Sequence, residues 1–526
     1  MGERGETLCS GRALSSVTIT QEWSTQLSAG STRAVGRGDC SSAVQMSPFD
    51  SLILPGSRNT CWTSALCAAV VLSISALARA NGRYPLAQQL LVDPSDAGHL
   101  FLRSTYGVLT SSDGGAAWSW MCESGIGYDP GEDPMMTILG DGSVLAGASE
   151  GLFTTRDRGC SWPKDSTIGD TFVRDLATES DGVVALALTV AVQPDGRYAT
   201  SVWRSPDGAH TFTDLGSVSS GSALPFTLDA APADSQRLYV TAATPSSGDA
   251  GAAVAPGVLF RSKDGGATWT ETPIPGTDRQ NAPYIGRVDP TNPDALYVRV
   301  QGDWDGTNPV ESWLLYTDDA GDTWREIFRA KADMLGFTLG PDPTTVLVGM
   351  GDTHSTLRPV DTTALGLYRA TSPSFTFTHL GGGQVGCLTY SGQTLYVCGG
   401  QAEDGYELGV SSDDGATVSP LFQYGTVTGP LACPSDSPQA TVCGSQWGIA
   451  CRGLGSCPHF DGGTGSSTGS NGGGCCGSAT PAPNRTQTGT AQLDMLAGPE
   501  SKGIVLAAAA AASLLRRLAR RRRSAR

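Results

Sequence analysis

Long apolar runs are missing from this chain of 526 residues. The two longest lie near residues 65–77 and 503–515 and hold about 13 residues each, whereas a helix that spans a bilayer needs about 20. Neither run is therefore long enough for an ordinary membrane-spanning helix.

Charge is scarce, and positive charge is the scarcer sign. Only 16% of the residues are charged, and 35 Lys and Arg stand against 51 Asp and Glu, for a net charge of −16. Seven Arg gather in residues 516–526, which leaves about −23 on everything before them. This balance argues against nucleic acid as a partner of the body of the protein.

The common catalytic motifs are absent as well. The sequence contains no G-x-S-x-G, no P-loop and no H-E-x-x-H. We expect no cofactor and no metal ion.

Cysteine, in contrast, is plentiful, and an export signal accompanies it. Fourteen Cys point to an oxidising compartment. Residues 58–80 combine Arg58, an apolar stretch and the A-x-A pattern Ala78-Arg79-Ala80, which is typical of a signal-peptidase site. We interpret residues 46–80, beginning at Met46, as a signal peptide and residues 1–45 as a spurious N-terminal extension. A signal-anchor helix is the alternative.

An eight-residue segment recurs seven times between residues 111 and 418. Its best copies are residues 262–269 (SKDGGATW) and 317–324 (TDDAGDTW); the others begin at positions 111, 155, 205, 370 and 411. Successive copies are about 41 to 57 residues apart, the spacing of one four-stranded propeller blade. We therefore predict an all-β fold: a single seven-bladed β-propeller over residues 81–426, with four antiparallel strands per blade. A six-bladed ring is the alternative, because the sixth copy lacks its Asp and its Gly.

Each copy is expected to be a structural turn. The Asp accepts hydrogen bonds from its own turn, the Gly supplies a positive φ, and the final aromatic ring is buried between neighbouring sheets. The residues assigned to this role are Asp113, Trp118, Asp157, Trp162, Asp207, Phe212, Asp264, Trp269, Asp319, Trp324, Phe377 and Asp413.

The pattern S-x-D-x-G-x-T-W resembles the Asp-box, or BNR, repeat. That family includes sialidases, sortilin-like receptors, oligoxyloglucan-hydrolysing glycosidases and photosystem assembly factors. The resemblance covers residues 88–424 and implies a propeller, but it leaves the function open because the family includes enzymes, receptors and assembly factors.

The cysteines that follow the signal peptide suggest several disulfides. Cys387 and Cys398 lie symmetrically about Gly392-Gln393, so a two-residue hairpin turn would set them opposite each other. We also expect Cys122 and Cys160 to link blades 1 and 2. A small disulfide cluster is expected in a Cys-rich segment, residues 427–459, among Cys433, Cys443, Cys451 and Cys457, with zinc as the rival interpretation.

The C-terminal region changes composition twice. Residues 460–502 are a Gly/Ser-rich linker that holds the pair Cys475-Cys476, and residues 503–526 combine an apolar patch with the Arg cluster. The order Cys, apolar helix, basic end resembles the C-terminal sorting tails of myxobacterial surface proteins. That resemblance implies a transient anchor through which alone the protein contacts the membrane; a degenerate basic tail is the alternative.

The ligand surface is expected opposite the repeats. If each repeat joins the third and fourth strands of its blade, the loops between second and third strands emerge on the other face, and in blades 3 to 6 these loops are long. They cover about residues 191–201, 245–257, 302–312 and 351–366. The candidate ligand-binding residues there are Trp304, whose exposed indole would stack on a sugar or a peptide, and Asp303, Asp305, His354, Arg358 and Tyr198. Residues 303–308 also resemble a calcium loop, although a plain turn fits them better.

We predict an exported protein, at the cell surface, in the outer envelope or secreted, that binds a glycan or a protein partner without catalysis. A sialidase-like glycoside hydrolase is the alternative. Sialidases clamp the substrate carboxylate with arginines and open with an R-x-P motif, which Arg83-Tyr84-Pro85 matches; Arg174 and Arg287 are the other candidates. An assembly factor for a membrane complex is a second alternative.

Overall fold

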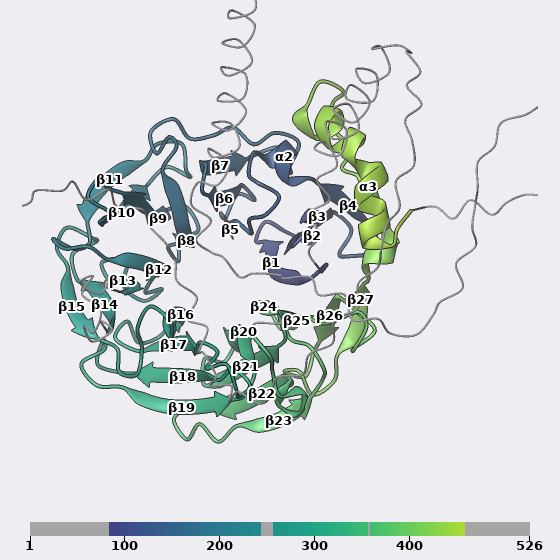
Figure 1. Ribbon diagram of the computed structural model, residues 1–526. Coiled ribbons are helices and arrows are strands. Elements are labelled where there is room, and N and C mark those ends of the chain that lie inside the picture. Colours follow the sequence, from purple (N-terminus) through teal and green to yellow (C-terminus); the bar gives the residue numbers. More distant parts are fainter. Residues whose placement is uncertain (1–83, 244–255, 356–357, 458–526) are drawn as a thin grey trace, which may run out of the picture. The chain divides into compact units, whose positions relative to one another are not determined.

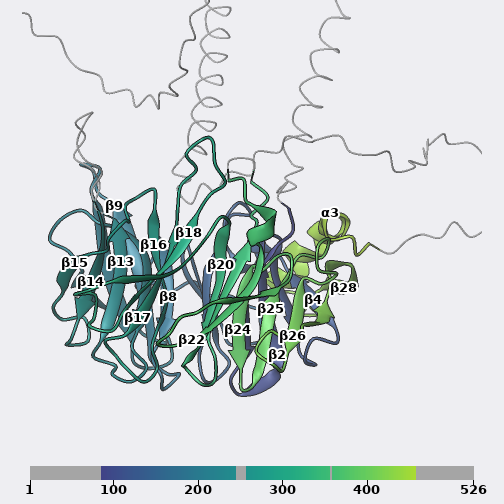
Figure 2. The same cartoon turned by 90° about the horizontal axis from the view of Figure 1, so that it is seen from below.

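The computed structural model describes residues 84–243, 256–355 and 358–457. Seven antiparallel sheets are arranged around a central axis, which confirms the seven-bladed propeller (Figure 1). Figure 2 shows the blades edge-on, with their strands running between the two faces of the ring. The predicted segments 1–45, 46–80 and 460–526, with Arg83 and the pair Cys475-Cys476, lie outside the described residues.

Each blade is an up-and-down sheet whose first strand lies innermost. Blade 1 contains β1 (Ala87–Asp93), β2 (Asp96–Ser104), β3 (Gly107–Ser111) and β4 (Trp118–Met121); blade 2 contains β5 (Met135–Ile138), β6 (Val144–Ala148) and β7 (Gly151–Thr155); blade 3 contains β8 (Phe172–Thr178), β9 (Ala185–Val192), β10 (Tyr198–Ser205) and β11 (Thr213–Ser217). The fourth strand of blade 2 is reduced to a bridge between Phe153 and Lys164.

The second half of the ring repeats this plan. Blade 4 contains β12 (Leu224–Ala230), β13 (Leu238–Ala243), β14 (Gly257–Ser262) and β15 (Thr270–Pro273); blade 5 contains β16 (Ala282–Val288), β17 (Leu296–Gln301), β18 (Ser312–Thr317) and β19 (Arg325–Ala330); blade 6 contains β20 (Asp333–Leu339), β21 (Thr345–Gly351), β22 (Gly366–Thr371) and β23 (Thr378–Gly381); blade 7 contains β24 (Cys387–Ser391), β25 (Thr394–Cys398), β26 (Leu408–Ser411) and β27 (Ser419–Phe422). The short helices are α2 (Glu123–Ile126), η1 (Thr362–Ala364), η2 (Tyr424–Thr426), η3 (Gln439–Cys443) and α3 (Gly444–Leu454). Within the described ranges no helix is long and apolar enough to cross a membrane.

The hydrophobic core lies between adjacent blades. Strands alternate their side chains between two faces, so each sheet has two faces to cover, and each is buried against the next sheet. Trp118 of blade 1, 1% exposed, packs on Phe422 of blade 7 with ring centroids 4.8 Å apart. Burial of such rings ties each blade to its neighbour.

Side chains near the axis also connect the inner strands. The carboxylate of Asp175 on β8 accepts a hydrogen bond from the N–H of Leu228 on β12 at 2.8 Å. One blade further on, Asp229 accepts from the N–H of Val288 at 3.2 Å. Burial raises the pKa of Asp175 to about 7, although its hydrogen bonds act in the opposite direction.

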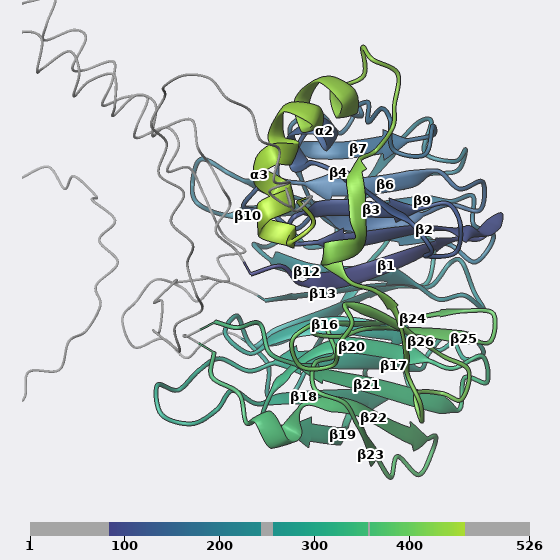
Figure 3. The same ribbon diagram turned by 90° about the vertical axis from the view of Figure 1, so that its right-hand side faces the viewer.

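The ring closes through the segment that follows blade 7. Strand β28 (Val427–Pro430) pairs in parallel with β4, on the outer edge of blade 1. Figure 3 shows α3 beside the strands of blade 1, and Figure 2 shows β28 next to β4. The Thr389 hydroxyl of blade 7 also donates to the Leu90 carbonyl of blade 1 at 3.1 Å, near the axis. Blade 7 is thus joined to blade 1 on the inner strands and on the outer edge.

Four disulfides are present among the described cysteines. The predicted Cys387–Cys398 bond is confirmed, and it joins paired positions of β24 and β25. The other expectations need correction: Cys122 does not pair with Cys160, and only Cys451–Cys457 is internal to the C-terminal segment.

Cys122 bonds to Cys443, and Cys160 bonds to Cys433. The C-terminal segment therefore lies along blades 1 and 2 and is covalently attached to both. The linear spacing of the cysteines contains no information about this docking, because it depends on where β28 pairs.

Candidate functional site

The seven repeat segments occupy one face of the ring. In blades 1 and 3 to 7 they connect the third strand of the blade to the fourth. The connections between second and third strands, and those from one blade to the next, therefore emerge on the opposite face.

The repeat turn is held by its own hydrogen bonds, as blade 7 illustrates. The Asp413 carboxylate accepts from the Ser411 hydroxyl at 2.7 Å, from the Thr417 N–H at 2.9 Å and from the Thr417 hydroxyl at 2.7 Å. These hydrogen bonds lower the pKa of Asp413 to about 2, and the largest effect comes from the Thr417 N–H. Gly415 adopts φ 84°, and a Cβ there would lie 2.0 Å from Leu367 of the preceding blade. The aspartate is fully engaged inside its turn.

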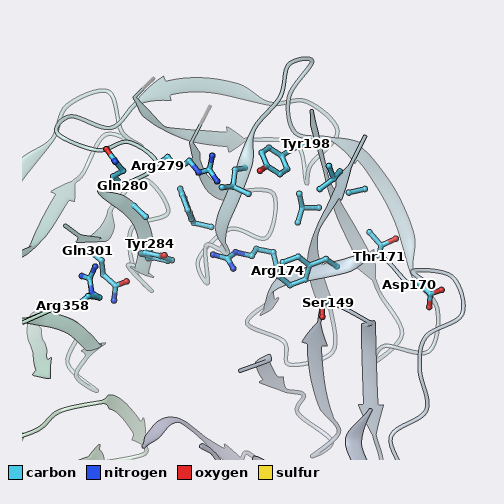
Figure 4. Close-up of a pocket in the computed structure, with 17 residues that line it drawn as sticks. Ser149, Asp170, Thr171, Arg174, Tyr198, Arg279, Gln280, Tyr284, Gln301 and Arg358 are labelled. Atoms are coloured by element: carbon cyan, nitrogen blue, oxygen red, sulfur yellow. The ribbon is translucent and has the colours of Figure 1, made fainter. Parts of the chain in front are cut away.

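A cavity of about 540 Å³ lies on the opposite face, where blades 3, 4 and 5 meet. Figure 4 shows its lining residues, among them Arg174, Tyr198 and Tyr284. The lining consists of Ser149, Asp170, Thr171, Phe172, Arg174, Val190, Ala191, Val192, Tyr198, Leu224, Phe226, Arg279, Gln280, Ala282, Tyr284, Gln301 and Arg358.

A β-bulge directs Arg174 into this cavity. On β8, Val173 pairs with Thr189 and Asp175 pairs with Leu188, so Arg174 is the extra residue between them. A bulge re-aims the side chain of its extra residue. Figure 4 shows Arg174 pointing toward Tyr284, which belongs to blade 5. On β12 the register also shifts between Pro225 and Thr227, around the cavity-lining Phe226.

An Asp-centred turn supplies the next two polar residues. The Asp278 carboxylate accepts from the N–H of Gln280 and from the N–H of Asn281, both at 2.7 Å. Short acidic side chains stabilise such turns. Arg279 and Gln280 stand at its tip, between β15 and β16, and line the cavity.

Arg358 lines the opposite side, and its charge is already paired. Its Nη2 lies 2.6 Å from the Oδ1 of Asp333, whose side chain is 1% exposed. The same nitrogen donates to the Gly302 carbonyl at 2.9 Å. Burial raises the pKa of Asp333, and the hydrogen bond and charge of Arg358 oppose this. The pair fixes the loop that follows β21 to the blade 5–6 boundary.

Aromatic and aliphatic side chains form the walls. Phe226 and Tyr284 lie with ring centroids 5.4 Å apart. They belong to an apolar cluster with Leu224, Ala282 and Tyr198. The lining therefore combines these apolar side chains with polar groups, among them the guanidinium groups of Arg174, Arg279 and Arg358.

Three of the predicted site residues meet at this cavity: Tyr198, Arg358 and Arg174. Arg287 does not line it. Instead it lies on the exposed part of β16 near Asp229; burial raises the pKa of Asp229 and Arg287 partly offsets that effect. The structure thus does not bring Arg174 and Arg287 into one clamp.

The other candidates lie in the loops of blades 5 and 6. Trp304 is half-buried, and its Nε1 has no hydrogen-bond partner among the described residues, so the expectation of an exposed indole is wrong. Asp303 and Asp305 cap local turns through the N–H groups of Trp304 and Thr307, each at 2.8 Å. His354, with φ 55°, packs on Tyr84 at 4.4 Å between ring centroids.

Part of the predicted loop 191–201 is also wrong. Strand β9 continues to Val192 and strand β10 begins at Tyr198, so the hairpin is longer and its loop is shorter than expected. In blades 5 and 6 the loops lie where predicted, between Gln301 and Ser312 and between Gly351 and Gly366.

Sequence reasoning missed Phe172, Phe226, Arg279 and Tyr284. All four lie at the start of an inner strand or just before one, in the connection from one blade to the next. The candidate ligand-binding residues were taken from the loops between second and third strands, although the connections between blades emerge on the same face. Their position at the start of a predicted inner strand was the sequence signal that could have identified them.

The lining offers little for acid–base chemistry. Asp170 is the one carboxylate among the described lining residues, and it pairs with Lys164. The hydrogen bond and charge of Lys164 lower the pKa of Asp170. Across the described part of the chain, no group of three or more His, Cys, Asp or Glu is placed to hold a metal ion.

The fold and the cavity define the class: a seven-bladed β-propeller with a ligand-sized cavity opposite its repeat turns. No protein-family model matches the chain, and no curated protein matches it. Among solved structures, the Niastella koreensis GH74 enzyme is similar at 14% identity and TM-score 0.32, over 64% of this chain and 63% of that one.

Two further solved structures are similar. Kuenenia stuttgartiensis hydrazine synthase has 11% identity and TM-score 0.40, over 62% of this chain and 96% of that one. YCF48 from Cyanidioschyzon merolae has 13% identity and TM-score 0.34, over 60% of this chain and 92% of that one. At these values the likeness concerns the propeller fold and carries no argument about activity or partners.

Proposed function

We propose that the protein is an exported propeller that binds a glycan or protein ligand in the cavity between blades 3, 4 and 5, without converting it chemically. The observation that carries this proposal is the cavity itself. Its volume of about 540 Å³ lies within the range of roughly 300–1,000 Å³ found for ligand pockets. It also combines an apolar interior with a few convergent polar groups, as ligand sites do.

Export is supported by the four disulfides. Disulfides form and persist in oxidising compartments, and two of these attach the C-terminal segment to the ring. The mature protein is accordingly expected at the cell surface, in the outer envelope or secreted, with membrane contact limited to its C-terminal tail.

Binding is favoured over hydrolysis by the carboxylates of the lining. Most glycoside hydrolases need two carboxyl groups across the scissile bond. The described lining holds Asp170 alone, already paired with Lys164. A sialidase-like reaction is therefore the less supported alternative.

The test uses the full chain, purified from an oxidising expression compartment. Binding to a glycan array and to a panel of surface proteins is measured for the wild type, for Tyr284→Ala and for Trp304→Ala. Tyr284 lines the cavity, whereas Trp304 belongs to a loop of the same face outside it. We expect Tyr284→Ala to weaken a wild-type ligand at least tenfold and Trp304→Ala to leave it unchanged.

If Trp304→Ala weakened binding and Tyr284→Ala did not, the ligand site would lie at the blade 5 loop instead of the cavity. Turnover of a fluorogenic sialoside or glucoside, abolished by Arg174→Gln, would replace the binding proposal with the hydrolase. Arg287→Gln is the matched control, because Arg287 does not line the cavity.

A further inference from the structure

We propose that the ligand of this cavity is an amphipathic carboxylate, meaning an apolar body that ends in one carboxylate group. The inference rests on the proposed function, and it adds the chemical class that the cavity selects. Two unpaired guanidinium groups at an apolar cavity are the observation behind it.

Arg174 is the first of these groups. It has no hydrogen bond or ion pair with any described residue, and its buried Nε lacks a partner. The guanidinium carbon lies 6.0 Å from the centroid of the Phe172 ring. Burial raises the pKa of the neighbouring Asp175, and the charge of Arg174 acts to lower it. The adjacent Asp175 is occupied elsewhere, since its oxygens accept from the N–H groups of Leu228 and Leu176.

Arg279 is the second. It is exposed at the tip of the Asp278 turn and forms no ion pair within the described ranges. The other charges of the lining are compensated, because Arg358 pairs with Asp333 and Asp170 pairs with Lys164. Two positive charges thus remain at this cavity in a protein of net charge −16. A guanidinium group without an ion-pair partner attracts an anion, and its planar fork matches a carboxylate.

The walls determine what the rest of the ligand resembles. The lining contains side chains without a hydrogen-bonding group, those of Val190, Val192, Leu224, Phe226 and Ala282, beside the neutral polar side chains of Ser149, Thr171, Tyr198, Gln280, Tyr284 and Gln301. Each sugar hydroxyl placed against them would lose its water without gaining a partner, which is unfavourable. An aromatic or aliphatic body would instead gain from burial. The apolar part of the lining therefore favours a ligand that has an apolar body.

Two sources supply this chemistry: a free aromatic or aliphatic acid, and the C-terminus of a polypeptide whose last residue is apolar. Both present one carboxylate beside an apolar group. The experiment separates them by the length of the probe.

The probes are N-acetyl-L-phenylalanine, its neutral amide, and pentaglycyl-phenylalanine with a free or an amidated C-terminus. Binding to the full chain is measured by calorimetry at low and high salt. We expect each acid to bind at least tenfold more tightly than its amide, and the difference to shrink as salt screens the charges. These comparisons use the wild type alone, so they hold even if a variant fails to fold.

The variants locate the contact. Arg174→Met and Arg279→Met are each expected to reduce acid binding about tenfold and to leave amide binding unchanged. Arg287→Met removes an exposed arginine of the same inner-strand ring outside the cavity, and it is expected to change neither. Tighter binding of the peptide acid than of the small acid would identify a polypeptide terminus; the reverse would identify a free acid.

Equal binding of acids and amides would overturn the inference, as would acid binding that survives both cavity variants. Arg174-dependent binding of an acidic glycan, without binding of these probes, would also overturn it while leaving the proposed binding function intact. If neither the probes nor the glycan and protein panels depend on the cavity residues, the proposed function fails as well.

Discussion

The covalent attachment of the C-terminal segment makes a quantitative prediction. Cys160, in the repeat turn of blade 2, bonds to Cys433, which is 273 residues away. A second bond, Cys122–Cys443, spans 321 residues. The perturbation is the double substitution Cys160→Ser with Cys433→Ser, compared with the same change at Cys387 and Cys398.

The expected magnitude follows from the chain entropy of the unfolded state. A cross-link over 273 residues would stabilise by about 5.6 kcal/mol on its own. The variant keeps the Cys122–Cys443 bond, however. When that bond is present, the Cys160–Cys433 bond closes only the loop formed by residues 122–160 and 433–443, about 48 residues, so its removal is expected to cost ~4 kcal/mol. The Cys387–Cys398 bond closes 11 residues and is worth about 2.8 kcal/mol.

We therefore expect the Cys160/Cys433 variant to lose about 1.3 kcal/mol more stability than the Cys387/Cys398 variant. Removal of both long-range bonds should exceed the sum of the two separate losses by about 1.5 kcal/mol, because each bond shortens the loop that the other closes. Urea denaturation followed by tryptophan fluorescence, without reductant, measures both quantities.

Reduced wild-type protein is the control for the loss of all the disulfides together. The reasoning is refuted if the short hairpin bond proves the more stabilising, or if the two long-range losses are simply additive. Either result would mean that loop closure in the unfolded chain does not account for the effect of these bonds on stability.

Three further outcomes are expected. Burial raises the pKa of Glu407 to about 8, above its value in an unfolded chain. The contribution of this group to stability is therefore present below about pH 4.5 and is lost as the pH rises toward 8. Glu407→Gln should make this loss of stability smaller, as measured by thermal unfolding at pH 5 and pH 9. Trp118→Ala, at a residue 1% exposed against Phe422, should cost about 3–5 kcal/mol of unfolding free energy in urea denaturation, and a loss below 1 kcal/mol would contradict its role between blades. Arg358→Met leaves the buried Asp333 without its ion-pair partner and should lower the free energy of unfolding by ~3–5 kcal/mol at pH 8. The loss should be smaller at pH 4, because protonation of Asp333 removes the unpaired charge. Equal losses at both pH values would exclude this explanation.

Much of the fold was predictable because the repeat is a local structure. The hydrogen bonds of Asp413 run to residues two before and four after it in the chain. Such a turn forms from the order of its own residues, and its recurrence sets the number of blades. The Cys387–Cys398 bond was predictable for the same reason, since both residues belong to one hairpin.

The candidate site was predictable only in part. Tyr198, Arg358 and Arg174 were identified from their loops or inner strands, but Arg279 and the aromatic walls were missed. The cavity is assembled mainly from blades 3 to 5, with Ser149 of blade 2 and Arg358 of blade 6 completing its lining, so residues more than one hundred positions apart in the sequence meet there. A bulge on β8 decides that Arg174 enters it, and a shift of one residue in strand pairing reverses the direction of a side chain.

The sequence by itself determined the class of fold and the position of the repeat turns, and it favoured seven blades over six, because the repeat turn depends on contacts within a few residues. The tertiary structure alone decided where the ring closes, which cysteines pair over 273 and 321 residues, and which arginines remain without a partner. These features depend on contacts between distant blades, where register and burial, rather than the local order of residues, fix the outcome.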